Sequence, residues 1–230
     1  MTGGQLHWRR WALILAVLAA LLATMVVWIG IARWHPSATD FPVQGMAVDS
    51  SNGEVDWFAA RTDDVAFAYV LATSGAGERD PMFDRNWRGL FDAGIRRGAI
   101  HRFSLCQPAA EQAALFISTV PRTADQLPAM LVIDSSAACP APVDRTAAIA
   151  AIREFLTLAE AHEGTPMLLA ISPDAESDYS ISAAIERPLV GQRLLIEPGY
   201  LSRPWQIWQA SDLRRIAGAK GTVRWLVVAP

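Results

Sequence analysis

Residues 11–32, near the N-terminus, form a run of 22 positions without a charged side chain, WALILAVLAALLATMVVWIGIA. An α-helix rises about 1.5 Å per residue, so a helix of this length spans a hydrocarbon layer of about 30 Å. Arg9 and Arg10 precede the run and Arg33 alone follows it closely, which by the positive-inside rule keeps the N-terminus in the cytoplasm. The pattern predicts a single-pass anchor in the inner (cytoplasmic) membrane, with residues 1–10 cytoplasmic and the C-terminal domain in the periplasm.

A cleaved signal peptide is the alternative interpretation of this run. Gly30, Ile31 and Ala32 give the small-x-small pattern of a cleavage site. The apolar part of a signal peptide is normally only about 7 to 15 residues long, which favours an uncleaved anchor. Residues 33–42, which contain Pro, Ser and Thr, then form a short tether.

The remainder of the chain is acidic. Residues 1–35 hold three arginines and no acid, so 17 of the 20 basic residues remain against 23 acidic residues, a net charge of −6. This balance argues against a nucleic-acid partner, which needs a basic face. Two cysteines and scattered histidines offer no ligand cluster at zinc spacing, so neither a metal nor a cofactor is predicted.

Both cysteines, Cys106 and Cys139, lie in the part that we expect to be exported, where oxidation is possible. A disulfide between them would close a long loop and contribute about 2 to 4 kcal/mol. We predict this disulfide, with two free buried thiols as the alternative.

Beyond the tether, short apolar runs alternate with amphipathic stretches. The stretches predict helices over residues 81–98, ended by Gly98, over residues 108–120, and over residues 143–164, ended by Gly164. The runs predict eight strands, over residues 43–48, 66–72, 99–103, 129–134, 166–171, 192–196, 205–209 and 223–228. This alternation favours an α/β fold, an irregular (β/α) TIM-like barrel over residues 43–230, shorter than the usual length of about 250 residues.

The carboxyl ends of the strands are where such a barrel places its chemistry. Asp134 is the candidate acid, because it ends an apolar run. Val132, on the same face of the strand, can neither donate nor accept a proton, so this strand offers no second acid. Hydrolysis of a glycosidic bond ordinarily takes two carboxyl groups, and Asp49 could be the second. His101 could act as a proton carrier. The alternatives are a solvated loop acid for Asp49 and a hydrogen-bonded structural histidine for His101.

Three further residues at the strand ends would suit a carbohydrate cleft. Trp208 could stack on a sugar face while Gln209 bonds to hydroxyls, and Arg102 could contact the substrate. An indole is also a common core residue, so a packing role for Trp208 is an equal alternative.

Several segments together resemble those of family 25 glycoside hydrolases, the N-acetylmuramidase lysozymes that cut peptidoglycan. In chain order they are GMAVDSSNGEVDW (45–57), YVLATSG (69–75), DPMFDRNWRGLFDAGIRRGAIHRF (80–103), LPAMLVIDSS (127–136) and PWQIWQASD (204–212). The resemblance covers about residues 43–228 and implies a barrel whose ligand is peptidoglycan or a related glycan. Cys106 and Cys139 also look like the cysteine pair of a proteobacterial branch of the family.

The chain departs from this family at its acidic positions. The family's first strand carries an aspartate that lines the active site, and this chain has Ala47 there. The family's D-x-E becomes Val132-Ile133-Asp134, so the aspartate is lost and the glutamate regarded as the acid is one methylene shorter. Near the C-terminal end of its domain the family carries a V-D pair, and Arg224 replaces the aspartate of that pair here. The other departures are Asn52, Leu71, Ser74, Ile100, Arg102 and Ala210.

Three hypotheses follow for the function. The first is a pseudo-enzyme of weak or absent hydrolytic activity that binds glycan strands or an unknown protein partner near the envelope. The second is an active muramidase in which Asp134 and Asp49 form a rearranged carboxylate pair. The third is an envelope scaffold or protein-interaction domain whose cleft no longer accepts sugar.

Overall fold

The computed structural model describes residues 3–134, 139–141 and 143–230, and the chain divides into two units, residues 1–34 and residues 35–230. The first unit is a single helix, α1 (Gly3–Arg33). Its segment Arg10–Arg33 is long and apolar enough to cross a membrane, a property shared by signal sequences. The bounds expected for the anchor (11–32), the tether (33–42) and the barrel domain (43–230) remain predictions.

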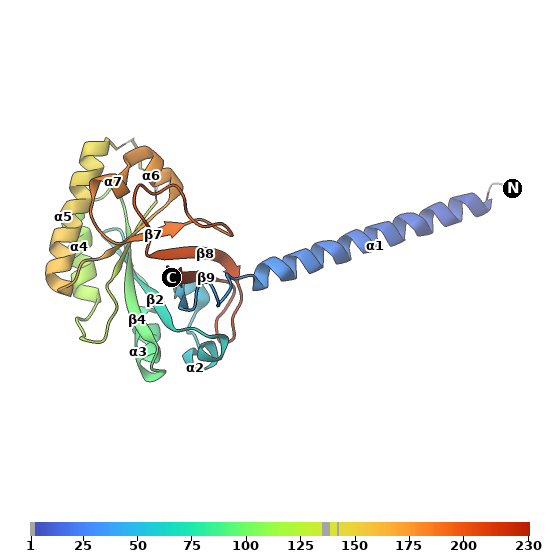
Figure 1. Ribbon diagram of the computed structural model, residues 1–230, viewed down its shortest axis with the longest axis horizontal. Helices are drawn as coiled ribbons and strands as arrows, with labels where there is room; N and C mark the ends of the chain where they lie inside the picture. Colours follow the sequence, from blue (N-terminus) through green and yellow to red (C-terminus); the bar gives the residue numbers. More distant parts are fainter. Residues whose placement is uncertain (1–2, 135–138, 142) are drawn as a thin grey trace. The chain divides into compact units, whose positions relative to one another are not determined.

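The second unit contains a closed barrel of eight strands (Figure 1). Six neighbouring pairs, from β1–β2 round to β7–β8, are parallel, while β9 lies antiparallel between β8 and β1 and closes the barrel. The strands are β1 (Gln44–Val48), β2 (Phe67–Ser74), β4 (Arg96–Phe103), β5 (Met130–Ile133), β6 (Leu168–Ile171), β7 (Leu189–Gln192), β8 (Ile207–Arg214) and β9 (Val223–Val228). The predicted fold class, an irregular (β/α) barrel, is confirmed.

Helices on the outside cover most of the parallel strands. The longest, α5 (Arg145–Glu163), is capped by Asp144, whose side chain accepts from Thr146 N and Ala147 N, and it ends at Gly164 with φ of 77°. It packs beside α4 (Ala109–Thr119), as Figure 1 shows. The shorter helices are α2 (Trp57–Ala60), α3 (Phe83–Asp92), α6 (Pro173–Tyr179) and α7 (Ile181–Ala184), with 3-10 turns η1 (Ser50–Asn52) and η2 (Arg61–Asp63).

Two predicted boundaries are wrong. The helix expected over residues 81–98 ends at Asp92, and Gly98 lies inside β4, where a side chain would collide with the Tyr69 ring. In place of the strand expected over residues 192–196, the structure has β7, which begins three residues earlier, at Leu189. Leu195 has φ of 66°, outside the strand region, so the apolar residues 194–196 belong to an exposed loop.

The interior of the barrel is filled with apolar side chains from all eight strands, including Ala47, Ile100, Val132, Ile207 and Leu226. The strands therefore close around a packed apolar core. A two-residue strand, β3 (Glu78–Arg79), folds back on β2 beyond this core and forms a hairpin at the carboxyl end of the barrel.

Candidate functional site

The apolar interior ends, at the carboxyl ends of the parallel strands, in a ring of polar side chains. Side chains alternate along a strand, so a residue two positions beyond an interior side chain also faces inward. By this rule the opening is lined by Asp49 after β1, Arg102 on β4, Asp134 after β5, Gln209 on β8 and Arg224 on β9. We call these five the mouth residues. Both arginines act electrostatically on both carboxylates, which agrees with this placement.

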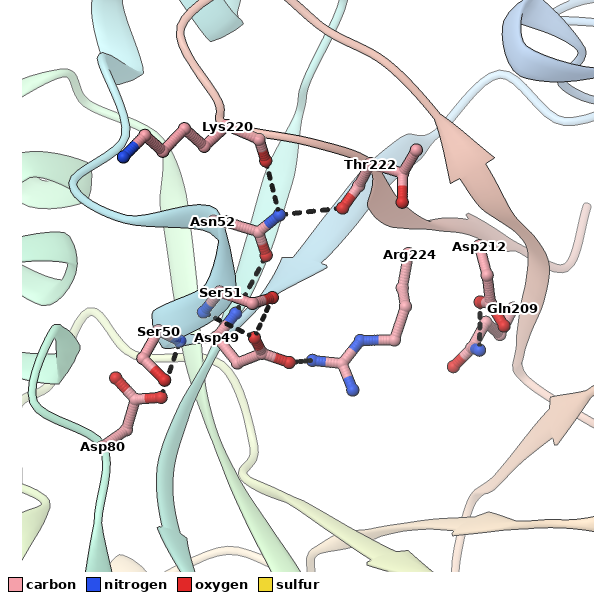
Figure 2. A network of polar contacts seen from close by, with 10 residues as sticks. All are labelled: Asp49, Ser50, Ser51, Asn52, Asp80, Gln209, Asp212, Lys220, Thr222 and Arg224. Atoms are coloured by element: carbon pink, nitrogen blue, oxygen red, sulfur yellow. Dashed lines mark hydrogen bonds and ion pairs between the residues drawn. The ribbon is translucent and has the colours of Figure 1, made fainter.

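Asp49 is held from two sides. Its Oδ1 accepts hydrogen bonds from Ser51 N at 3.0 Å and Ser51 Oγ at 2.6 Å, and its Oδ2 accepts from Arg224 Nη2 at 3.2 Å (Figure 2). Burial works to raise the pKa of Asp49, but the Ser51 hydroxyl and the charge of Arg224 outweigh it, so the pKa lies below its ordinary value. Asp49 is therefore suited to remain ionised.

The turn that carries Asp49 is fixed by amide and carboxylate side chains. Asn52 accepts from Asp49 N and donates to the carbonyl oxygens of Lys220 and Thr222, at 3.0 and 2.8 Å (Figure 2). Asp80 accepts from Ser50 N at 2.7 Å. These contacts join β1 to the loop before β9 and to the β2–β3 hairpin, which gives the Asp49 carboxylate a defined position.

Asp134 lies in a different environment. It is half-buried and makes no hydrogen bond or ion pair with the residues that the structure describes. Burial raises the pKa of Asp134 above its ordinary value, although the charges of Arg102 and Arg224 act in the opposite direction. The two carboxyl groups of the mouth are thus shifted in opposite directions, Asp134 toward the protonated form and Asp49 toward the ionised form.

A cavity of about 450 Å³ opens on the mouth between β1, β2, β4 and the β2–β3 hairpin. Asp49, Leu71, Ser74 and Arg102 are part of its lining. A neighbouring cavity of about 460 Å³ shares Ser74 and Arg102 and extends to Gln107. Gln107 Oε1 accepts from Ala76 N in the hairpin, so the β4–α4 loop supports the wall between these cavities.

The predicted disulfide between Cys106 and Cys139 is confirmed, with a Cα–Cα distance of 5.3 Å. Cys106 lies in the loop after β4 and Cys139 in the segment that follows Asp134. The bond therefore joins two positions that closely follow Arg102 and Asp134 in sequence.

The structure does not bring His101 to the mouth. Its side chain faces the helix layer, where it is fully buried, stacks on Phe155 at 4.5 Å between ring centroids, and bonds to Thr73 Oγ1 at 2.7 Å and Gln112 Oε1 at 3.2 Å. Burial lowers the pKa of His101 to about 4, against the effect of the hydrogen bond with Gln112. This environment fits the structural alternative considered for His101.

Trp208 also faces away from the opening. It is buried against Phe41 and Trp205, with centroid distances of 5.8 and 6.2 Å, and its Nε1 donates to Arg193 O. The neighbouring Gln209 faces inward and donates from Nε2 to Asp212 Oδ1 at 2.6 Å (Figure 2). Of the three residues expected to contact sugar, Arg102 and Gln209 reach the mouth.

Tyr200 was not anticipated from the sequence. Its hydroxyl donates to Ile171 O and accepts from Gln192 N, at the ends of β6 and β7. Burial raises the pKa of Tyr200 to about 12, and Asp134 contributes in the same direction, which places Tyr200 near the mouth. Tyr200 lies in an irregular loop, so no periodic pattern marks it.

In the described part of the chain, no group of three or more His, Cys, Asp or Glu side chains is positioned to hold a metal ion. The mouth residues themselves comprise two acids, two arginines and an amide. This set can hydrogen-bond hydroxyls and bind anions, and it contains two carboxyl groups with opposite pKa shifts.

Comparison with known proteins points to one family. The model of glycosyl hydrolases family 25 matches residues 47–219. A family 25 glycosyl hydrolase from Bacillus anthracis aligns with a TM-score of 0.77 at 25% identity, covering 86% of this chain and 93% of its own. A lysozyme from Streptomyces coelicolor aligns with a TM-score of 0.72 at 24% identity, covering 82% and 92%, and supports the fold alone.

Two curated proteins are also similar in sequence. Uncharacterized protein YegX of Escherichia coli (strain K12) is 27% identical over 198 residues, which cover 80% of this chain and 68% of YegX. Lysozyme M1 of Streptomyces globisporus is 37% identical over 59 residues, which cover 26% of this chain and 20% of that protein.

Proposed function

Because the chain belongs to glycosyl hydrolases family 25, we propose that its barrel binds peptidoglycan or a related glycan at the mouth and hydrolyses it weakly or not at all. Relatives named lysozymes share the fold and part of the sequence, which supports a cell-wall glycan as the ligand. The amide, hydroxyl and guanidinium groups beside the two mouth cavities are suited to sugar hydroxyls and acetamido groups.

The observation that carries the proposal is the ion pair between Arg224 and Asp49. The family resemblance assigns acids to positions 47, 132 and 224, and here Ala47 and Val132 belong to the apolar interior while Arg224 neutralises Asp49. An oxocarbenium-like transition state needs a second carboxylate to balance its charge. Groups that act as a unit fail together, so these replacements should lower turnover by orders of magnitude.

The barrel would act outside the cytoplasm. We assign α1 as an uncleaved anchor in the inner membrane, with the barrel in the periplasm, because its apolar segment is longer than a signal peptide requires. Alkaline carbonate extraction and mass spectrometry test this assignment. An anchored protein stays with the membrane at its full mass, whereas a cleaved one is recovered soluble and lacks about the first 32 residues.

The experiment for function uses the purified full chain in detergent and insoluble peptidoglycan. Sedimentation measures binding, and released reducing ends measure hydrolysis. We expect the chain to sediment with the glycan and to release few reducing ends above a blank. Arg85→Gln, on the outer face of α3 and paired with Glu54, serves as the surface control. If the chain does not sediment with glycan, the binding proposal is wrong and the scaffold hypothesis gains support.

One observation favours the active muramidase as a second candidate. The pKa of Asp134 is raised and that of Asp49 is lowered, the division of roles that an acid and an ionised partner require. In that case Asp134 would protonate the leaving oxygen and Asp49 would assist at the anomeric carbon. Release of reducing ends that is lost in both Asp134→Asn and Asp49→Asn would support this candidate.

A further inference from the structure

We propose that Arg102 forms an anion site in the mouth and binds a carboxylate carried by the glycan. This inference rests on the proposed glycan-binding function and names the chemical feature by which the ligand would be selected. The site consists of the Arg102 guanidinium, the Ser74 side chain on the adjacent strand, and the two cavities that both residues line.

The position of Arg102 is fixed by its strand. It lies on β4, with Ser74 of β2 and Val132 of β5 as its partners in register, and its carbonyl oxygen accepts from Gly75 N at 3.0 Å. Its side chain follows Ile100 on the inward face, so the guanidinium rises from the packed interior into the opening. A rigid strand therefore presents this charge to the cavities.

The guanidinium of Arg102 has unused hydrogen-bonding capacity. It is half-buried and makes no hydrogen bond or ion pair with any side chain in residues 3–134, 139–141 and 143–230. A guanidinium carries five N–H donors in a planar fork that matches a carboxylate in two parallel hydrogen bonds. The hydroxyl of Ser74 likewise has no hydrogen-bond partner in this part of the chain.

The nearby charges explain why Arg102 is left without an ion pair. Asp49 is already bound by Arg224 and Ser51. Asp134 feels the charge of Arg102, but the two side chains are too far apart to form an ion pair. Arg224 also repels Arg102, since the two cations act on each other across the mouth. A ligand carboxylate would relieve this repulsion. Glu78 also lines both cavities, but its side chain is exposed, so solvent weakens its interaction with Arg102.

Peptidoglycan offers this carboxylate from two sources. The lactyl group of muramic acid has a free carboxylate when its peptide has been removed, and the stem peptide has carboxylates of its own. A neutral oligomer of N-acetylglucosamine has neither. If the lactyl group is the ligand, an amidase reaction that releases the peptide must precede binding.

The test is calorimetric binding by the full chain in detergent micelles to three glycans of equal length: neutral N-acetylglucosamine oligomers, peptide-free strands containing muramic acid, and peptide-bearing strands. We expect at least one carboxylate-bearing strand to bind about tenfold more tightly than the neutral oligomer. The strand with the higher affinity identifies the source. The preference should weaken in high salt, because the contact is partly exposed.

Three variants assign the preference to this residue. Arg102→Gln should bind all three glycans about equally, and Arg102→Lys should retain part of the preference because it keeps the charge and loses the fork. Arg85→Gln removes the same charge from an outer helix and should bind as the wild type does. Equal affinity of the wild type for all three glycans, or a preference that survives in Arg102→Gln, overturns the carboxylate site and leaves glycan binding standing. Absence of binding to every glycan overturns both proposals.

Discussion

Arg224 on β9 donates from Nη2 to Oδ2 of Asp49, 3.2 Å away after the end of β1, and both side chains are largely shielded from solvent. The two strands are antiparallel neighbours at the closure of the barrel, with Arg224 opposite Ala47. One of the two mouth carboxylates is therefore engaged by an arginine. This ion pair is the basis of the proposal that the mouth binds glycan and cleaves it weakly or not at all.

Replacing Arg224 should show how much the ionised form of Asp49 depends on this ion pair. Arg224→Met should raise the pKa of Asp49 and lower the free energy of unfolding at pH 7 by about 1 to 2 kcal/mol. The folded-state pKa of Asp49 is lowered, so the ion pair stabilises above the unfolded pKa of about 4 and is lost as pH falls through the folded value. Urea unfolding at pH 7 and pH 3 measures this difference, which should shrink at the lower pH.

The matched control for that variant is Arg79→Met. Arg79 pairs with Asp84 at 2.8 Å, but its side chain is 49% exposed and that of Asp84 is 59% exposed. Exposed pairs contribute little, so this substitution should cost less than about 0.5 kcal/mol. Equal costs for the two variants would contradict the role given to the mouth ion pair.

His101 should make the protein sensitive to mild acid. Its pKa is lowered by burial to about 4 in the folded state, against about 6.5 when unfolded. The unfolded state therefore takes up a proton first, and stability present above pH 6.5 is lost as pH falls toward 4. The expected loss between pH 7 and pH 5 is about 2 kcal/mol.

Urea unfolding across this pH range checks the prediction for His101. His101→Gln should flatten the pH dependence while lowering stability at pH 7, because Thr73 and Phe155 lose a partner. His162→Gln, which alters a half-buried histidine bonded to Val120 O, should retain the slope. A slope unchanged in His101→Gln would show that another group causes it.

The disulfide should contribute substantially to stability. Cys106 and Cys139 are separated by 33 residues, and closing a loop of that size in the unfolded chain corresponds to about 4 kcal/mol. The double variant Cys106→Ser with Cys139→Ser should lose about that amount in urea unfolding. Reductant should lower the stability of the wild type by a similar amount and leave the double variant unchanged.

Gly45 should be sensitive to the smallest side chain. A Cβ there would collide with the carbonyl oxygen and ring of Phe67 on the adjacent strand β2, and the backbone oxygen cannot move without disturbing the barrel. Gly45→Ala should destabilise the protein by about 3 kcal/mol. At Gly199 a Cβ meets nothing within 4 Å, so Gly199→Ala should change stability by less than about 0.5 kcal/mol. Thermal unfolding of both variants tests the contrast.

Much of the fold could be predicted from the sequence, because each buried strand leaves an apolar run. The exception is β7, where Val190 faces the barrel interior and Leu189 is buried on the opposite face, while the more apolar residues 194–196 lie outside the strand. Periodicity alone cannot separate these runs. The left-handed conformation of Leu195, stabilised by its N–H bond to Ala210 O, depends on contacts that are remote in sequence.

The site was only partly predictable. Asp134, Arg102 and Gln209 reach the mouth, whereas His101 and Trp208, each one residue from an inward-facing side chain, point into the outer layer. Alternation along the strand would have separated the two groups, since Val132 and Asp134 fix the inward face and the same rule applies to β4 and β8. Neither Tyr200 nor the pairing of Asp49 with Arg224 could be found this way, because loop packing and the closure of β9 on β1 determine them.

The most direct measurement is a single-turnover assay with the full chain in excess over soluble, end-labelled glycan strands, in which mass spectrometry detects every new reducing end. Binding with little or no cleavage is the predicted result, with the wild type close to the Asp49→Asn, Asp134→Asn double variant. Stoichiometric cleavage by the wild type that disappears in Asp134→Asn would contradict the account and establish the mouth as a working pair of carboxyl groups.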